Sequence, residues 1–210
     1  TTQEWFRVFD FLRETVSGIV ILFGGEPCVR EDLPELIKYA NEIDLPYTLI
    51  TNATMPKRIL RMYVKSLTCP IRTYPFANDY RTMCSYKLLL KCKHIFPDLT
   101  AEIMPTRDNI QHIPRIIDVF DAFEINTIVA SPIHWGNEDF WLFRGPYVNE
   151  LCFRPDDEKL IMEVMDKLIE DYCGKSLLWT PKAYLEALKR YTVGLNWHCT
   201  RLVNICIDAD

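Results

Sequence analysis

Four short polar segments carry the residue types best suited to hold a small ligand. Residues 24–27 read Gly-Gly-Glu-Pro, 51–54 Thr-Asn-Ala-Thr, 105–109 Pro-Thr-Arg-Asp-Asn and 131–135 Ser-Pro-Ile-His-Trp. Adjacent glycines let a backbone approach a ligand closely, so that its amide and carbonyl groups can bind it. Arg107 offers a planar fork of donors for a carboxylate or phosphate, and Thr51, Asn52 and Asn109 add neutral hydrogen bonds. This set suits a zwitterionic or nucleoside-like small molecule.

Each polar segment follows a run of residues whose pattern predicts a strand. The run at residues 19–23 is short, apolar and β-branched, which is typical of a strand covered on both faces. Apolar residues at helical spacing predict helices between the runs. The expected strands are residues 19–23, 47–50, 66–73, 100–104 and 125–130, and the expected helices lie near residues 1–16, 32–40, 56–65, 81–94 and 113–120.

Strands that alternate with helices at this spacing form βα units, whose strands run parallel with right-handed crossovers. An open doubly wound sheet and a full or partial (β/α) barrel both satisfy the pattern. In either fold, ligands bind where the strands end and the following loops begin. The four polar segments are therefore expected to lie on one rim, around one pocket.

Each segment also has a simpler interpretation. Gly-Gly-Glu-Pro could be an ordinary turn, Arg107 a surface ion-pair partner, Asn52 or Asn109 a helix cap, and His134 a packed side chain. Their coincidence at successive strand ends is what favours a shared pocket.

Composition narrows the class of protein. The chain has 210 residues and a formal net charge of −5, so it lacks the cationic surplus that drives binding to nucleic acid. No apolar run approaches the ~20 residues that cross a bilayer, and the start does not resemble a signal peptide. The eight cysteines include no Cys-x-x-Cys pair. We therefore expect a cytoplasmic protein with mostly reduced, buried thiols and with no nucleic-acid or membrane partner.

The alternation of strands and helices changes after residue 130. A long aromatic loop precedes an amphipathic helix at residues 156–172, and a second helix at residues 181–191 precedes a strand at residues 202–207. The pattern predicts a boundary near residue 155, which divides the chain into a domain at residues 1–155 and a C-terminal extension at residues 156–210.

The aromatic loop is the expected source of substrate specificity. It combines aromatic surface with a cation directly after the last polar segment, and the candidate substrate contacts are His134, Trp135, Trp141 and Arg144. Aromatic side chains could shield a reactive species from water or bind a peptide. The alternative interpretation is a lid packed against the helix that follows.

The sequence resembles the radical S-adenosylmethionine enzymes. The resemblance is most specific at residues 21–27 (Ile-Leu-Phe-Gly-Gly-Glu-Pro) and 30–37, continues at residues 48–54 and 106–110, and covers about residues 1–135. It implies an α/β fold with parallel strands, a partial (β/α)6 TIM-like barrel. The cofactor-binding residues expected on this basis are Gly24, Gly25, Glu26, Pro27, Thr51, Asn52, Thr106, Arg107, Asn109 and Ser131.

The resemblance also implies a role for each group of these residues. Residues 24–27 would hold the amino group of the methionine moiety, largely through backbone atoms. Thr106, Arg107 and Asn109 would lie near its carboxylate or ribose, and the stretch after Ile125 would border the adenine.

The chemistry that the resemblance implies uses S-adenosylmethionine, a [4Fe–4S] cluster and a reductant such as a flavodoxin or ferredoxin. One electron passed to the sulfonium breaks its S–C5′ bond, and the resulting 5′-deoxyadenosyl radical takes a hydrogen atom from a peptide or small-metabolite substrate. An enclosed barrel would shield such a radical from water.

This sequence departs from the family pattern at the cluster ligands. The family's Cys-x3-Cys-x2-Cys motif is absent, and we expect it upstream of Thr1. The alternative is a degenerate relative without a cluster that binds a ligand or a partner protein. A third possibility, an ordinary (β/α) enzyme whose glycines bind a phosphate, is disfavoured by Glu26 and by the absence of a neighbouring lysine.

Two further segments bear on the family pattern. Residues 69–72 (Cys-Pro-Ile-Arg) stand where the family often has Ser-Ile-Asp, which leaves the role of this segment open. Residues 197–199 (Trp-His-Cys) and 203–210 resemble the start of a twitch or SPASM extension. Cys199 is therefore a candidate ligand of an auxiliary iron–sulfur cluster, with an ordinary loop cysteine as the alternative.

Overall fold

The computed structural model describes residues 1–72, 80–130, 151 and 153–192. Helices and strands alternate through this part of the chain, as the sequence predicts. The strands are β1 (Val20–Leu22), β2 (Tyr47–Ile50), β3 (Ser66–Ile71), β4 (Asp98–Ile103) and β5 (Asn126–Val129). The α-helices are α1 (Thr2–Thr15), α2 (Leu33–Glu42), α3 (Pro56–Ile59), α4 (Tyr80–Cys92), α5 (Ile113–Ala122), α7 (Glu158–Lys167) and α8 (Lys182–Thr192).

Short helical turns complete these elements. They are the 3-10 helices η1 (Pro27–Val29), η2 (Ile110–His112) and η4 (Pro155–Asp157), and the π-helical turn η5 (Leu168–Tyr172). The α-helical part of α3 is shorter than the helix predicted at residues 56–65, because the amides of Arg61 and Met62 bond three residues back, to Arg58 and Ile59. Helix α1 begins with a capping box that Thr1 and Glu4 form.

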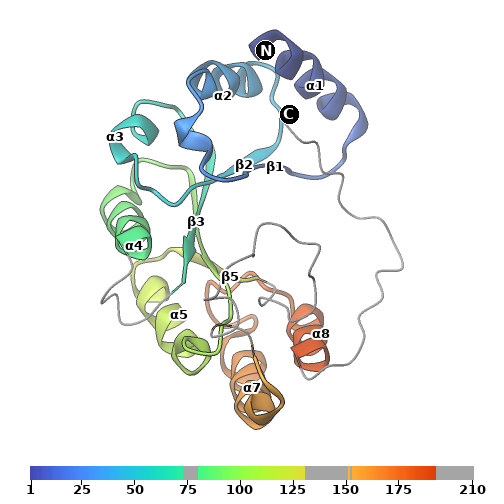
Figure 1. Ribbon diagram of the computed structural model, residues 1–210, viewed down its shortest axis with the longest axis vertical. Coiled ribbons are helices and arrows are strands. Elements are labelled where there is room, and N and C mark those ends of the chain that lie inside the picture. The colour runs from blue at the N-terminus through green and yellow to red at the C-terminus, as the bar shows by residue number, and fades with distance from the viewer. Residues whose placement is uncertain (73–79, 131–150, 152, 193–210) are drawn as a thin grey trace.

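All five strands are parallel and pair in the order in which they occur along the chain, β1-β2-β3-β4-β5. A doubly wound sheet reverses its strand order at a switch point, and this sheet has no such reversal. Helices α1 to α5 follow one another around the strands (Figure 1). The expected partial barrel is therefore confirmed, and the alternative of an open doubly wound sheet is excluded.

Alternation along each strand separates the core from the interior of the barrel. Residues that face the helices are buried, such as Leu49, Leu67, Ala101 and Ile103. Their neighbours in sequence face the concave side, where many are polar. Near the amino ends of the strands, the Ser66 hydroxyl donates to Asp98 Oδ2 at 2.6 Å. The side-chain amide of Asn126 donates to Asp98 Oδ1 at 3.3 Å. A polar ladder therefore crosses β3, β4 and β5 at this end of the barrel.

Strand β1 differs from its prediction. Ile19, Ile21 and Phe23 are 66%, 53% and 64% exposed, whereas Val20 and Leu22 pack against the core. The prediction that this run is covered on both faces was wrong, because helices cover only one face of the sheet and the other face looks into the barrel.

The elements after residue 155 continue the barrel. The helix predicted at residues 156–172 is present as η4, α7 and η5, and α7 contacts both α5 and α8. The Thr127 amide donates to the Leu177 carbonyl at 2.9 Å and the Trp179 amide to the Thr127 carbonyl at 2.8 Å, so Leu178 forms a parallel bridge to β5. The domain boundary near residue 155 stays a prediction, and these contacts favour a barrel that extends beyond it.

Candidate ligand-binding site

The diglycine corner, residues 24–27, follows β1 at the carboxyl end of the sheet. Gly24 has φ of +117° and Gly25 has φ of +45°, so both lie in a region that L side chains rarely adopt. A Cβ atom placed on either glycine would meet nothing within 4 Å. Backbone conformation rather than crowding therefore requires these glycines, and open space lies beside them where a ligand could approach.

The Glu26 carboxylate joins the diglycine corner to the end of β2. Its Oε1 accepts hydrogen bonds from the Cys28 amide at 3.0 Å and the Thr51 hydroxyl at 2.6 Å, and its Oε2 accepts one from the Asn52 amide at 2.8 Å. Both carboxylate oxygens are used within the protein. Glu26 therefore positions two neighbouring corners. The carbonyls of Glu26 and Pro27 accept from the amides of Val29 and Arg30, so the backbone of Gly24 and Gly25 is the part of this corner best placed to contact a ligand.

The corner after β2 has its own internal support. Thr51 is buried and its Oγ1 also accepts a hydrogen bond from the Ala53 amide at 3.2 Å. Asn52 Oδ1 accepts hydrogen bonds from the amide of Thr54 at 3.0 Å and from its hydroxyl at 2.7 Å. Ala53 has φ of +57°, which is uncommon for a residue other than glycine. These contacts fix a strained turn directly beside the diglycine corner.

The corner after β4 is organised by Asn109, which is 1% exposed. Its Nδ2 donates to the carbonyls of Arg72 at 2.7 Å and Met104 at 2.9 Å, and its Oδ1 accepts from the Thr106 amide at 2.8 Å. The Thr106 hydroxyl donates to Asp108 at 2.6 Å. Asn109 therefore ties the end of β3 to the end of β4, much as Glu26 ties β1 to β2.

Arg107 lies in the same corner and forms an ion pair across the rim. Its Nε is 3.0 Å from Asp157 Oδ2, its amide donates to the Leu151 carbonyl at 2.9 Å, and its side chain is 34% exposed. Arg107 therefore forms an ion pair, as its simpler interpretation in the sequence predicted. Asp157 lies at the start of the helix predicted at residues 156–172, and its pairing with a residue 50 positions away has no local sequence signal.

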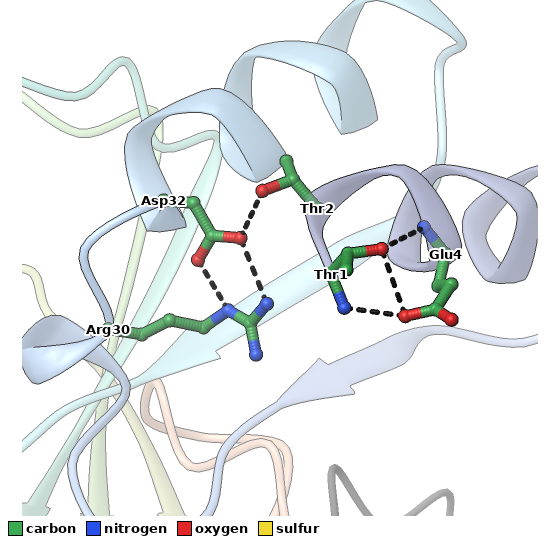
Figure 2. A network of polar contacts seen from close by, with 5 residues as sticks. All are labelled: Thr1, Thr2, Glu4, Arg30 and Asp32. Carbon is green, nitrogen blue, oxygen red and sulfur yellow. Dashed lines mark hydrogen bonds and ion pairs between the residues drawn. The ribbon is translucent and has the colours of Figure 1, made fainter.

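Polar contacts hold the start of α1 beside the diglycine corner (Figure 2). Arg30 donates to both oxygens of Asp32, at 2.6 and 2.9 Å, and the Thr2 hydroxyl donates to Asp32 Oδ2 at 2.6 Å. The Arg30 guanidinium also lies 5.6 Å from the centroid of the Trp5 ring. Because residues 30–32 come directly after η1, the amino end of α1 lies on the same rim as the strand ends.

One charged side chain in the barrel interior was missed by sequence analysis. Glu102, on β4, is partly buried, and burial raises the pKa of its carboxyl while Arg72 opposes the shift. Its signal in the sequence was a single acidic residue between buried neighbours in a strand, Ala101 and Ile103.

The described cysteines do not fit an iron–sulfur cluster. Cys28, Cys69, Cys84, Cys92 and Cys173 form no disulfide, and the first, second and fourth are buried as predicted. Burial raises the pKa of Cys28 to about 12 and raises those of Cys69, Cys92 and Cys173 as well, which disfavours the thiolate that binds metal. Among the residues described, no three His, Cys, Asp or Glu side chains gather as a metal site.

Several predicted site residues lie outside the described part of the chain. They are Ser131, His134, Trp135, Trp141, Arg144 and Cys199, together with the strand predicted at residues 202–207. Two surface hollows in the described part lie elsewhere, one between α2 and residues 61–63 and one between α5 and α7. Within the described residues, no helix is both long and apolar enough to span a membrane.

Replacing Glu26 with glutamine tests its role in joining the two corners. A glutamine amide would present a donor where the carboxylate accepts from the Thr51 hydroxyl or the Asn52 amide. We expect the free energy of unfolding in urea to fall by about 1–3 kcal/mol. The control is Glu35→Gln on the exposed face of α2, and equal stability of the two variants would contradict this role.

The contacts of Asp32 predict a pH-dependent contribution to stability. Hydrogen bonds from Arg30 lower the pKa of Asp32 below its usual range, so the charged form is favoured in the folded state. Its contribution is therefore present at neutral pH and is lost as the pH falls below about 4. Asp32→Asn should lower the free energy of unfolding at pH 7 by under about 1 kcal/mol. A difference in stability between the two proteins that did not shrink as the pH was lowered from about 5 to about 2 would contradict the assignment.

Comparison with known proteins identifies relatives of this chain. It is 26% identical over 148 residues to a PqqA peptide cyclase of Granulibacter bethesdensis, covering 64% of this chain and 40% of that protein. It is 34% identical over 139 residues to the Fe-coproporphyrin III synthase of Methanosarcina barkeri, covering 61% of this chain and 35% of that protein. No family model matches. The chain thus spans about two fifths of the length of these relatives, or less.

The fold has relatives among solved structures. Streptococcus suis SuiB bound to S-adenosylmethionine matches with a TM-score of 0.64 and 16% identity, over 85% of this chain and 42% of that one. SuiB bound to its precursor peptide SuiA matches with the same TM-score. The sequence relatives support the resemblance to the radical S-adenosylmethionine family, and the fold is shared with SuiB.

Proposed function

We propose that the chain is the S-adenosylmethionine-binding part of a radical S-adenosylmethionine enzyme. In the proposed reaction, a reductant such as a flavodoxin or ferredoxin supplies one electron, which cleaves the sulfonium into methionine and a 5′-deoxyadenosyl radical. The radical takes a hydrogen atom from the substrate and leaves as 5′-deoxyadenosine. The substrate radical then reacts further to give the product.

The geometry of the diglycine corner is the observation that carries this proposal. The corner is open to a ligand at Gly24 and Gly25, and it is fixed by Glu26 without using the backbone groups of the glycines. Backbone carbonyls in such a corner can accept hydrogen bonds from an ammonium group. The amino group of the methionine moiety is such a cation, so we assign it to residues 24–27.

The remainder of the ligand would lie along the rim. Arg107 stands at the end of β4 and would pair with the methionine carboxylate through donors other than the Nε held by Asp157. The adenine would lie beyond β5, near Ser131. This arrangement uses three of the four polar segments and would bring the sulfonium near the centre of the rim.

The proposal requires a cluster whose ligands are not among the described residues. The contacts of Asp32 with Thr2 and Arg30 hold the amino end of α1 at the rim. A segment preceding Thr1 would therefore reach the rim beside the diglycine corner. We propose that three cysteines spaced Cys-x3-Cys-x2-Cys stand in such a segment and bind the [4Fe–4S] cluster.

We infer a peptide as the first substrate class to test. Among the relatives, one is named a PqqA peptide cyclase and another is SuiB bound to a precursor peptide. A small metabolite is the second class, which the resemblance to a coproporphyrin-related synthase supports. His134, Trp135, Trp141 and Arg144 are the proposed substrate contacts, and Cys199 is a proposed ligand of an auxiliary cluster.

Anaerobic reconstitution with iron and sulfide separates this function from that of a cluster-free binding protein. The protein used must include the segment upstream of Thr1. We expect iron–sulfur absorption near 400 nm on the order of one cluster per chain, and 5′-deoxyadenosine after dithionite and S-adenosylmethionine are added. The control replaces the upstream cysteines with alanine. A protein that gains no cluster and forms no 5′-deoxyadenosine would support the cluster-free alternative instead.

Arg107→Ala tests the proposed contact with the methionine carboxylate. We expect the affinity for S-adenosylhomocysteine to fall by about 1.5–3 kcal/mol, or roughly 10- to 150-fold, in isothermal titration calorimetry. Binding of 5′-methylthioadenosine, which lacks the carboxylate, should be unchanged and serves as the control for folding. Equal losses for both ligands would mean that Arg107 acts by holding Asp157 in place.

A further inference from the structure

Positive charge is concentrated in one part of this acidic chain. The whole chain carries a net charge of −5, yet residues 45–78 contain no aspartate or glutamate. The basic residues of this stretch are Lys57, Arg58, Arg61, Lys65 and Arg72. The first three lie in or directly after helix α3, which follows the corner at the end of β2. A local positive field on an acidic protein favours the approach of an acidic partner.

The basic residues at α3 are not neutralised by carboxylates of the described chain. Lys65 shows the usual arrangement, since its Nζ lies 3.0 Å from Asp44 Oδ1. Among the described residues, no ion pair includes Lys57, Arg58 or Arg61. Lys57 and Arg61 are also exposed, so both charges are available at the surface.

Apolar side chains accompany these two charges. Met55, Leu60 and Tyr63 are exposed, and Tyr63 and Arg61 line the surface hollow between α2 and residues 61–63. We call Met55, Lys57, Leu60, Arg61 and Tyr63 the basic α3 surface. Methionine, aromatic residues and arginine are enriched at protein interfaces. The basic α3 surface therefore has the composition of a protein-binding site.

The contacts of Arg58 connect the basic α3 surface to the amino end of α1. The Arg58 guanidinium donates to the carbonyls of Arg30 at 2.6 Å and Glu31 at 2.8 Å. Arg30 binds Asp32, which also accepts the hydroxyl of Thr2 (Figure 2). A few side chains therefore separate this surface from the place where the proposed cluster segment would reach the rim.

We propose that the basic α3 surface is the docking site of a small acidic protein that donates the electron for cleavage of S-adenosylmethionine. This inference rests on the proposed function, which requires a one-electron donor beside the amino end of α1. The donor loses one electron and the cluster gains it, and no proton or group is transferred. Electron-transfer partners associate weakly through small interfaces, which suits a surface built on one turn and the adjoining hollow.

An acidic substrate peptide is the other partner that such a charge would attract. Helix α3 lies on the outer wall of the barrel (Figure 1), whereas a substrate must reach the radical at the rim. An electron donor acts from outside the barrel and leaves the rim open to ligand and substrate. The position of the surface therefore favours the electron donor.

The test is the double variant Lys57→Gln with Arg61→Gln, made in a protein that includes the segment upstream of Thr1. The probes are an acidic flavodoxin and an acidic ferredoxin, and binding is measured by isothermal titration calorimetry at low salt. We expect the double variant to bind the donor about tenfold more weakly, and this difference to shrink in about 0.5 M NaCl. Lys159→Gln with Lys167→Gln on α7, which removes the same charge elsewhere on the barrel, should leave the affinity unchanged.

A kinetic measurement accompanies the binding experiment. The rate of 5′-deoxyadenosine formation is measured with each reduced donor protein and, separately, with dithionite, which needs no docking site. At subsaturating donor, the ratio of the donor-driven to the dithionite-driven rate should fall about tenfold in the double variant. Division by the dithionite-driven rate removes any effect of the substitutions on folding or on cluster content.

The outcomes separate this inference from the proposed function. If neither donor binds the unmodified protein, or if the double variant binds equally well, the inference is overturned, and 5′-deoxyadenosine formed with dithionite leaves the proposed function standing. A polyglutamate peptide that binds as tightly as the donors, and is weakened equally by the double variant, would assign the surface to an acidic peptide instead. Absence of 5′-deoxyadenosine with dithionite would overturn the proposed function and this inference together.

Discussion

The candidate site depends on the hydrogen bonds that the Glu26 carboxylate accepts from two strand ends. Strand β1 is only three residues long, so ladder pairing alone stops short of the diglycine corner. Glu26 continues the connection, because it binds the Thr51 hydroxyl and the Asn52 amide of the neighbouring corner. This carboxylate thus holds the diglycine corner, with both glycines at positive φ, beside the corner that follows β2.

Asn109 serves the same purpose further around the barrel. It bonds the carbonyls of Arg72 and Met104, and so fixes the ends of β3 and β4 relative to each other. Two short polar side chains, one acidic and one neutral, thus hold the four described corners of the rim in two pairs. Such a rim can be rigid while its glycines and Arg107 remain accessible to a ligand.

Sequence patterns predicted the helices, the strands and the corners well, because each of these depends on residues that are close together in the sequence. Apolar runs identified the strands, and Gly-Gly-Glu-Pro marked the turn with two positive φ angles on which the candidate site is built. The same patterns could not show that Ile21 faces an open interior, since an apolar run looks alike whether helices or a cavity cover it. They also missed the bridge at Leu178 and the pairing of Arg107 with Asp157, which arise only when distant segments meet.

The barrel interior changes in character from one end to the other. At the amino ends of the strands, Ser66, Asp98 and Asn126 satisfy one another, whereas Glu102 near the rim has no donor among the described residues. Hydrogen-bonded polar side chains lie at the amino ends of the strands, and an acceptor without a donor lies toward their carboxyl ends. This contrast is expected of a fold whose stability is provided at the base of the sheet and whose ligand contacts lie at the carboxyl ends of the strands.

A crystal structure of this chain with S-adenosylhomocysteine tests the central claim most directly. The account predicts that the amino group of the ligand lies within hydrogen-bond distance of the backbone of residues 24–27. Ligand density elsewhere, such as in the hollow between α5 and α7, with residues 24–27 untouched, would contradict it.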